Sequence, residues 1–265
     1  MPTRGVPARI EVLGQHLEYR WIGPEPEEAP TIVFLHEGLG CLAMWRDFPD
    51  RLAAATGCGA LVYSRMGYGA SDPVPGPRSV RFMHQEALEV LAAVIDRFQL
   101  QQVVLFGHSD GASIAVVYAG ARPGAVRALV LEAPHVFVEP VCVESIARIA
   151  QAYGTTRLRE KLGRYHGDNS DSMFQTWTDV WLRPEFRTWN IEEYLPSIES
   201  PVLVVQGEND EYGTIRQVEA VVTQVSGLTR SLVLARCGHS PHSDQPDAVL
   251  EAAGRFVRET LDLER

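Results

Sequence analysis

Apolar residues recur along this chain with two different spacings. Near the N-terminus, alternation of apolar and polar positions over Ala8–Leu13 and Leu17–Ile22 predicts a β-hairpin that turns at Gly14 and Gln15. Further along, short apolar runs alternate with longer stretches of helical spacing. We predict strands over the short runs: Thr31–Leu35, Ala60–Tyr63, Val103–Phe106, Ala128–Leu131, Val202–Val205 and Ser231–Leu234.

The longer stretches predict helices over Trp45–Ala55, Val80–Phe98, Ala112–Gly120, Ile215–Val225 and Pro246–Leu263. Strands that alternate with helices form a mainly parallel sheet with helices on both faces. Between residues 138 and 200 the helical spacing continues without any strand pattern. We therefore predict an α/β fold with a mostly parallel eight-stranded sheet. Its core would comprise residues 1–137 and 201–265, and a helical cap, 138–200, would follow the sixth strand.

Composition narrows the class of protein. Apolar residues make up 45% of the chain and charged residues 22%, which is ordinary for a soluble globular protein. The net charge is −10 and Lys161 is the only lysine, so nucleic acid is not an expected partner. No signal-peptide pattern or membrane-length apolar run is present, which favours a cytoplasmic protein with no membrane partner. Cys41, Cys58, Cys142 and Cys237 form no CxxC pair, and we expect free thiols and no metal.

The strongest chemical signal is the segment Gly107-His108-Ser109-Asp110-Gly111. It follows an apolar strand pattern and precedes a helical one, which is the context of a GxSxG nucleophile elbow. The tight turn needs flanking glycines and exposes the serine hydroxyl above the sheet. This context favours Ser109 as a nucleophile over the alternative of a serine that only caps a helix.

A serine hydroxyl needs a base to remove its proton and an acid to orient that base. Asp210 follows one strand pattern and His239 follows the next. The order along the chain is therefore serine, acid, histidine, which is the order that accompanies a GxSxG elbow. Glu132, at the end of an earlier strand, is a rival acid, and His242 is an alternative base. Glu208 and Glu211 also flank Asp210, but we expect both to be solvated.

An oxyanion intermediate needs backbone N–H donors. The residue after the nucleophile, Asp110, would supply one, and the loop His36-Glu37-Gly38-Leu39-Gly40 would supply another, with Gly38 our choice. The loop lacks the GxGxxG pattern of a dinucleotide site, so no cofactor is expected.

These motifs together resemble those of the α/β-hydrolase superfamily, in particular its capped serine hydrolases. The resemblance rests on GHSDG, GENDEYG around Asp210, CGHSPHSDQP around His239, and GYGAS, which is similar to a structural turn after the fourth strand. It implies the α/β-hydrolase fold and a Ser109–His239–Asp210 triad, but no substrate. The serine at the nucleophile position argues against the related dehalogenases and epoxide hydrolases, which carry aspartate there.

Two carboxylates depart from the family pattern. Glu37 replaces a glycine of the HGxxG loop, and Asp110 stands where many relatives have an apolar residue. We expect both side chains to point away from the oxyanion, with Arg65 or His36 as a neutralising partner. The alternative is that Glu37 binds a cationic or hydroxylated group of the substrate.

Aromatic residues of the predicted cap and core suggest a pocket for a small molecule. Trp177 and Trp181 share a helical face, and together with Trp45, Phe137 and Glu37 they are candidates for its wall. The function predicted is cleavage of a small carboxylic ester or lactone through an acyl-enzyme on Ser109. The alternatives are a carbon–carbon bond hydrolase of the meta-cleavage product type, with a cationic site for a substrate carboxylate, and a small-molecule receptor with little or no turnover.

Overall fold

The central feature of the fold is one twisted sheet. A computed structural model describes residues 5–263, and within them eight strands follow the order β1-β2-β4-β3-β5-β6-β7-β8. β2 is antiparallel to β1 and β4, and all other neighbours are parallel, which confirms the predicted sheet. The strands are β1 (Ala8–Val12), β2 (Gln15–Ile22), β3 (Thr31–Leu35), β4 (Gly59–Tyr63), β5 (Val103–His108), β6 (Ala128–Glu132), β7 (Val202–Gly207) and β8 (Thr229–Leu234).

The opening hairpin turns one residue earlier than predicted. Val12 pairs with Gln15, so Leu13 and Gly14 form a two-residue turn. Both have positive φ, 53° and 77°, as a turn that matches the twist of a hairpin requires. Gly14 accepts this conformation without a steric penalty, and Leu13 is a rarer occupant.

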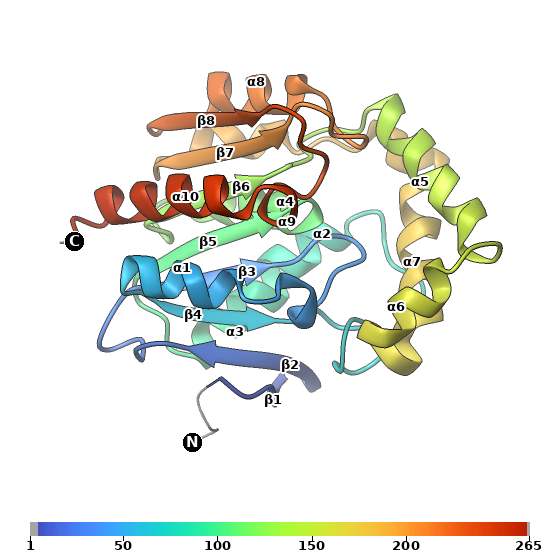
Figure 1. The fold of residues 1–265 in the computed structure, drawn as a ribbon, viewed down its shortest axis with the longest axis horizontal. Helices are drawn as coiled ribbons and strands as arrows, with labels where there is room; N and C mark the ends of the chain where they lie inside the picture. Colours follow the sequence, from blue (N-terminus) through green and yellow to red (C-terminus); the bar gives the residue numbers. More distant parts are fainter. Residues whose placement is uncertain (1–4, 264–265) are drawn as a thin grey trace.

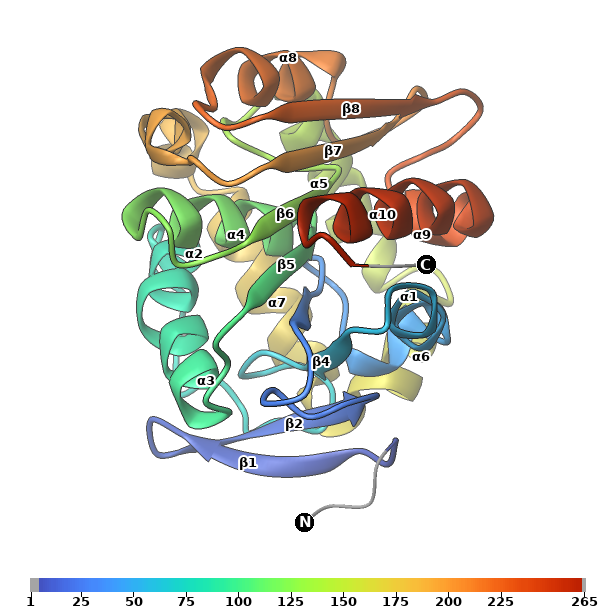
Figure 2. The ribbon, with the colours of Figure 1, turned by 90° about the vertical axis from the view of Figure 1, so that its left-hand side faces the viewer.

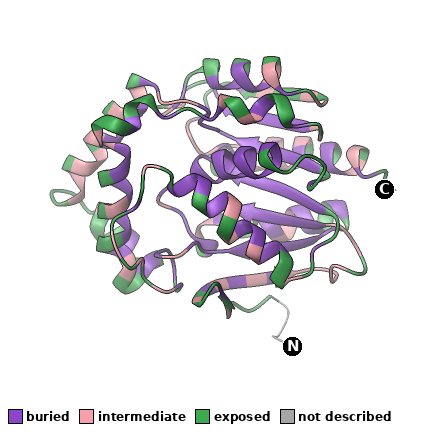
Figure 3. Cartoon of the chain, turned by 180° about the vertical axis from the view of Figure 1, so that it is seen from behind, coloured by how far each residue is buried: buried purple, intermediate pink, exposed green. Residues whose placement is uncertain are grey.

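Helices cover both faces of the sheet (Figure 2). On one face lie α1 (Phe48–Thr56) and α10 (Pro246–Thr260), and on the other lie α3 (Ala92–Arg97), α4 (Asp110–Ala121) and α8 (Ile215–Gln224). Each layer encloses its own apolar core. The strands β3 to β7 are buried along their whole length, and so is α4 up to Gly120, whereas α1, α8 and α10 expose their outer faces (Figure 3). Continuous apolar runs, rather than alternating ones, are therefore what the central strands require.

Two predicted helices are interrupted. The stretch predicted as Val80–Phe98 consists of α2 (Phe82–Gln85), a π-helical segment η2 (Glu86–Leu91) and α3. The stretch predicted as Trp45–Ala55 divides into the 3₁₀ turn η1 (Leu42–Trp45) and α1, because Arg46 has a positive φ of 53°. Pro49 then occupies the first turn of α1, where its missing N–H costs nothing.

The segment between β6 and β7 contains helices only. These are α5 (Pro140–Tyr153), α6 (Leu158–His166), η3 (Gly167–Asn169), α7 (Ser170–Trp181), η4 (Pro184–Thr188) and η5 (Glu192–Ser197). Figure 1 shows α5, α6 and α7 standing together beyond one end of the sheet. η5 instead returns to the core, where Tyr194 lies against Gly120 of α4. The cap boundaries, 138 and 200, stay a prediction.

Two smaller expectations concern the thiols and the membrane. All four cysteines are buried and unbridged, as expected. Within residues 5–263, no helix combines the length and the apolar character needed to cross a bilayer.

The packing of α10 gives a direct test of the fold. Phe256 is 2% exposed in the core under α10, whereas Arg255 next to it is exposed. We expect Phe256→Ala to lower the free energy of unfolding by about 3–5 kcal/mol, because a buried ring leaves a cavity. Arg255→Ala on the same helix should change it by less than about 0.5 kcal/mol. Urea denaturation of both variants measures the difference, and equal losses would contradict this placement of α10.

Candidate active site

The turn between β5 and α4 holds Ser109 in a strained conformation, with φ 53° and ψ −118°. The neighbouring glycines make this turn possible. A Cβ on Gly107 would meet the backbone of Ala112 at 2.6 Å, and a Cβ on Gly111 would overlap the carbonyl oxygen of Leu35 in β3. The elbow sequence is therefore required by backbone contacts, and the strain concentrates at the serine.

Three predicted residues form one hydrogen-bonded chain. Nε2 of His239 lies 2.9 Å from Oγ of Ser109, and Nδ1 of His239 lies 2.8 Å from both carboxylate oxygens of Asp210. A carboxylate can only accept, so Nδ1 carries the proton and Nε2 is free to accept the proton of Ser109. The arrangement can deprotonate the serine hydroxyl.

Asp210 is itself held in place. Its oxygens accept hydrogen bonds from the backbone N–H of Tyr212 at 2.8 Å and from Nε2 of Gln206 at 2.6 Å. Burial by itself raises the pKa of Asp210, but the adjacent His239 and the Tyr212 N–H outweigh it, and the pKa is lowered. Asp210 therefore stays ionised beside the imidazole.

The rival acid and the rival base pair with each other. Nδ1 of His242 lies 2.7 Å from Glu132 Oε2, and the backbone N–H of His242 donates to Glu132 Oε1. His242 is the second residue of the short helix α9 (Pro241–Asp244), which follows His239. Glu132 is thus occupied in fixing α9, and the structure places Asp210, not Glu132, against His239. Glu208 and Glu211 are exposed, as expected.

Both predicted oxyanion donors line the same cavity as Ser109. Within residues 5–263, the backbone N–H groups of Gly38 and Asp110 donate no hydrogen bond to protein. A Cβ on Gly38 would overlap Nε1 of Trp177, so only glycine fits beneath this indole. The two N–H groups are available to an oxygen beside Ser109.

The carboxylate of Asp110 turns away from solvent into a polar cluster. Its Oδ2 accepts a hydrogen bond of 3.2 Å from Nε1 of Trp177 and lies 4.0 Å from Nη2 of Arg65, both carboxylate and guanidinium being buried. Burial raises the pKa of Asp110, and the charges of Arg65 and Arg78 partly offset this. Arg65 is thus the expected partner of Asp110.

The carboxylate of Glu37 is paired with His108, not with Arg65 or His36 as the sequence suggested. Its Oε2 lies 3.5 Å from Nδ1 of His108, while the guanidinium of Arg65 donates to the backbone carbonyls of His36 and Glu37. Burial opposes ionisation of Glu37, but His108 outweighs it and lowers the pKa of Glu37 far below its ordinary value. The prediction of Arg65 or His36 as the partner of Glu37 was wrong, because His108 lies on β5 and meets this loop only through the parallel pairing of β3 and β5.

A cavity of about 210 Å³ opens over Ser109. Three of the five residues predicted for its wall line it: Glu37, Trp177 and Trp181. Residues that sequence reasoning missed complete the wall, and they come from β-strand ends and from α5: Leu39, His135, Cys142, Ile146, Glu211, Tyr212 and Ser240. Proximity to a predicted triad residue or strand end was the signal for Leu39, His135, Glu211, Tyr212 and Ser240. Cys142 and Ile146 of α5 had no such signal.

Trp45 and Phe137 are not among the residues that line this cavity, contrary to expectation. Trp45 is 2% exposed and packs edge-on against Phe34 and Phe106 of the central strands β3 and β5. Phe137 lies under the guanidinium of Arg216 and forms an isolated bridge with Asn190. Trp45 belongs to the core of the α1 face, and Phe137 joins the cap segment to the core.

A second group of buried side chains has the composition of a metal site. Within the described chain, His108, Glu132 and His242 bring potential ligand atoms within 4.8 Å of one another. Their polar atoms already face protein partners: His242 for Glu132, and Glu37 and the carbonyl of His239 for His108. The group is a charged hydrogen-bond network beside the triad.

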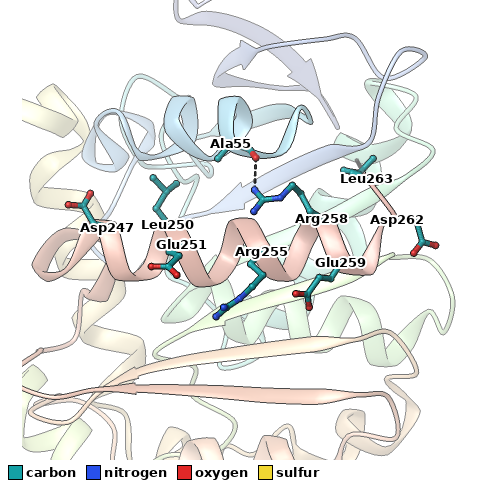
Figure 4. A pocket seen from close by; sticks show the side chains of 9 residues that line it. All are labelled: Ala55, Asp247, Leu250, Glu251, Arg255, Arg258, Glu259, Asp262 and Leu263. Atoms are coloured by element: carbon teal, nitrogen blue, oxygen red, sulfur yellow. Dashed lines mark hydrogen bonds between the residues drawn. The ribbon is translucent and has the colours of Figure 1, made fainter. Parts of the chain in front are cut away.

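A larger hollow lies elsewhere on the surface. It measures about 690 Å³ and runs along α10 beside Ala55 of α1 (Figure 4). Its wall carries acids and arginines, including Arg258, which donates to the carbonyl of Ala55. None of the triad residues contributes to it. The size of a cavity would therefore not by itself locate Ser109, Asp210 and His239.

Comparison with known proteins identifies the family. The alpha/beta hydrolase family pattern matches residues 32–252, which is most of the chain and includes Ser109, Asp210 and His239. The chain belongs to the alpha/beta hydrolase family. It is 21% identical to a proline iminopeptidase of Lactobacillus helveticus over 91% of this chain and 94% of that protein.

Further relatives of this alpha/beta hydrolase differ in their reactions. It is 28% identical to a 2-hydroxy-6-oxononadienedioate/2-hydroxy-6-oxononatrienedioate hydrolase of Pseudomonas putida, over 86% of each chain. The solved enol-lactonase of Burkholderia xenovorans LB400 superposes with a TM-score of 0.71 at 20% identity, covering 94% of this chain and 99% of that one. At this identity, the similarity to the enol-lactonase establishes a shared fold and not a shared reaction. Relatives of similar distance thus include a peptidase and a carbon–carbon hydrolase.

The hydrogen bond between Trp177 and Asp110 can be tested against a matched tryptophan. We expect Trp177→Phe to lower the free energy of unfolding by about 1–3 kcal/mol, because a buried carboxylate loses a donor. Trp189→Phe is the control, since the buried Nε1 of Trp189 has no hydrogen-bond partner in the structure. Guanidinium denaturation that shows the larger loss for Trp189→Phe would contradict the pairing.

The pairing of His108 and Glu37 predicts a pH-dependent stability. Burial lowers the pKa of His108, but the Glu37 contact and the charge of Glu132 outweigh it and raise the pKa to about 9. A raised folded-state pKa contributes stability below the unfolded value near 6.5, and this contribution is lost as pH rises through 9. At about 1.4 kcal/mol per pKa unit it amounts to roughly 3 kcal/mol.

We therefore expect the difference in unfolding free energy between the wild type and His108→Gln to shrink between pH 7 and pH 10. Urea denaturation at pH 7, 8, 9 and 10 measures it. A difference that stays constant over this range would mean that His108 is neutral in the folded protein.

Proposed function

We propose that this chain is a serine hydrolase that cleaves small, uncharged carboxylic esters or lactones through an acyl-enzyme on Ser109. The observation that carries the proposal is the hydrogen-bonded chain from Ser109 through His239 to Asp210, in a cavity with two unengaged backbone N–H groups. Its tautomer and its order along the chain are those that acyl transfer needs.

The mechanism follows from these positions. Oγ of Ser109 attacks the carbonyl carbon and gives its proton to Nε2 of His239, while the N–H groups of Gly38 and Asp110 bind the oxyanion. The intermediate collapses, and His239 returns the proton to the departing alkoxide oxygen. A water molecule then attacks the acyl-enzyme, gives its proton to His239 and releases the acid, and Ser109 regains its proton.

The cavity supports a small and uncharged substrate. Its volume of about 210 Å³ is below the usual 300–1,000 Å³ of pockets for drug-sized ligands. Trp177, Trp181 and Ile146 provide apolar wall, and the charged groups of the wall are all acidic: Glu37, Asp110 and Glu211. Among the described residues no lysine or arginine lines it. Glu37 is paired with His108 and Asp110 with Arg65, so Glu211 is the remaining acid of this wall. A substrate that carries a carboxylate, as the carbon–carbon bond hydrolase alternative requires, would find no lysine or arginine there to pair with.

Turnover of p-nitrophenyl esters tests the proposal. We expect hydrolysis of p-nitrophenyl butyrate, and a loss of at least about 1,000-fold in kcat for Ser109→Ala. Asp210→Asn should cost far more than Glu132→Gln, because only Asp210 fixes the tautomer of His239. Absence of turnover on ester, lactone and diketone panels would favour the receptor alternative, and turnover of the diketone alone would favour carbon–carbon bond cleavage.

Charge selectivity gives a separate test. p-Nitrophenyl hexanoate should be hydrolysed with a kcat/KM at least tenfold higher than mono-p-nitrophenyl adipate, which adds a carboxylate to a chain of the same length. A preference for the adipate ester would contradict the acidic wall as a determinant of specificity.

A further inference from the structure

The buried imidazole ring of His108 lies next to Ser109, to the loop that carries Glu37 and to the backbone of His239. His108 is the last residue of β5, directly before Ser109, and it is 0% exposed. Its Nδ1 lies 3.5 Å from the carboxylate of Glu37, and its Nε2 lies 2.7 Å from the backbone carbonyl oxygen of His239. We call these three groups the His108 clamp.

The chemistry of the clamp fixes the protonation of the ring. A carbonyl oxygen and an ionised carboxylate can only accept protons, so both ring nitrogens of His108 face acceptors. A neutral imidazole carries one N–H and could satisfy only one of these partners. The imidazolium can donate from Nε2 to the carbonyl and present its charge at Nδ1 to the Glu37 carboxylate, which it neutralises from a buried position.

Each end of the clamp acts on a catalytic group. Glu37 precedes Gly38, and its carboxylate folds back over Gly40, where a Cβ would overlap it. The oxyanion loop is therefore anchored at its second residue. At the other end, His108 fixes the backbone carbonyl of His239, and the ring of His239 contacts Ser109. The distance between the loop and the imidazole thus depends on one ring.

Other charged and titratable groups surround His108. Glu132 of β6 also acts on it electrostatically, but its two oxygens bind His242. The rings of His239 and His242 lie 5.3 Å and 5.1 Å from it, centroid to centroid. His135 has its pKa lowered to about 3 by burial and by His239 and His108, so it adds no charge at neutral pH. Glu132 is paired with His242, so Glu37 is the anion whose ion-pair partner is His108.

We propose that His108 and Glu37 are positioning residues for the hydrolysis: their ion pair holds the oxyanion loop at a fixed distance from His239. The inference rests on the proposed function. It assigns Glu37 to the catalytic geometry and not to recognition of the substrate. A clamp of this kind acts on the transition state, so its loss lowers kcat and leaves KM largely unchanged.

Steady-state kinetics on p-nitrophenyl butyrate tests the clamp in Glu37→Gln, His108→Gln and the double variant. We expect each single variant to lower kcat about 10- to 100-fold, as a displacement on the order of 1 Å does, with KM within about twofold of wild type. The double variant should lose little beyond the worse single variant, because the two residues act as a pair. Glu37→Asp, which keeps the charge, should recover part of kcat. Additive losses, or a change in KM alone, would overturn the proposal.

Recognition of the substrate by Glu37 is the competing role, and two esters separate it. Acetylthiocholine and its uncharged isostere 3,3-dimethylbutyl thioacetate differ only in the cationic nitrogen. The clamp predicts equal fractional losses on both for Glu37→Gln. A loss confined to the cationic ester would overturn the clamp and assign Glu37 to the substrate.

The rate at which a fluorophosphonate labels Ser109 separates failure of the clamp from failure of the proposed function. An unlabelled wild type would contradict the serine hydrolase, whereas a labelled wild type with equal rates in Glu37→Gln would contradict the clamp alone. His16→Gln is the control, since His16 is half-exposed and pairs with Asp72 at the sheet edge. It should match wild type. If His108→Gln does not fold, Glu37→Gln carries the test, because its side chain is 21% exposed at the cavity.

Discussion

The close approach of α4 to the end of β3 is the constraint on which the site depends. Gly111, in the first turn of α4, lies against the carbonyl oxygen of Leu35, and any side chain there would separate the two. This contact brings the elbow and the oxyanion loop together, since Ser109 and His36 follow directly from β5 and β3. The strain at Ser109, with its positive φ, is tolerated because pairing on both sides of β5 leaves the chain no other path.

Negative charge beside an oxyanion would oppose the proposed catalysis, and this chain has two unusual carboxylates, Glu37 and Asp110, in the wall of the cavity over Ser109. Each is turned from the oxyanion toward a buried cation, Asp110 toward Arg65 and Glu37 toward His108. Arg65 also donates to the carbonyls of His36 and Glu37, so the same guanidinium fixes the backbone of the loop. The carboxylates therefore contribute to the rigidity of the loop, while the backbone N–H of Gly38, in the cavity wall beside Ser109, has no acceptor among the described residues. A low-dielectric surrounding makes both pairings depend on the presence of both partners.

The sequence predicted those features that local pattern determines. Continuous apolar runs located the central strands within one or two residues, and motif order identified the members of the hydrogen-bonded chain. Contacts between distant segments were beyond it. Trp45 was predicted to line the pocket but fills the core beside Phe106. His108 occupies a position of the GxSxG pattern where any residue is allowed, although it faces Glu37. The π-helical segment after Gln85 arises inside a stretch whose spacing is uniformly helical. Such outcomes depend on tertiary packing and not on local propensity.

The same distinction limits what relatives can say about substrate. Ser109, Asp210 and His239 lie at or just beyond the carboxyl ends of central strands of the shared fold, whereas the relatives at 21% and 28% identity carry the names of different reactions. The cavity wall comes from α5, α7 and loop residues, where Trp177 seals the space above Gly38 and Glu211 stands at the rim. A substrate must fit beneath this indole while its carbonyl reaches Ser109. Among the described residues the wall offers a carboxylate no lysine or arginine, whichever bond is cleaved, so the charge of the wall is a better guide to substrate than the reaction of any one relative.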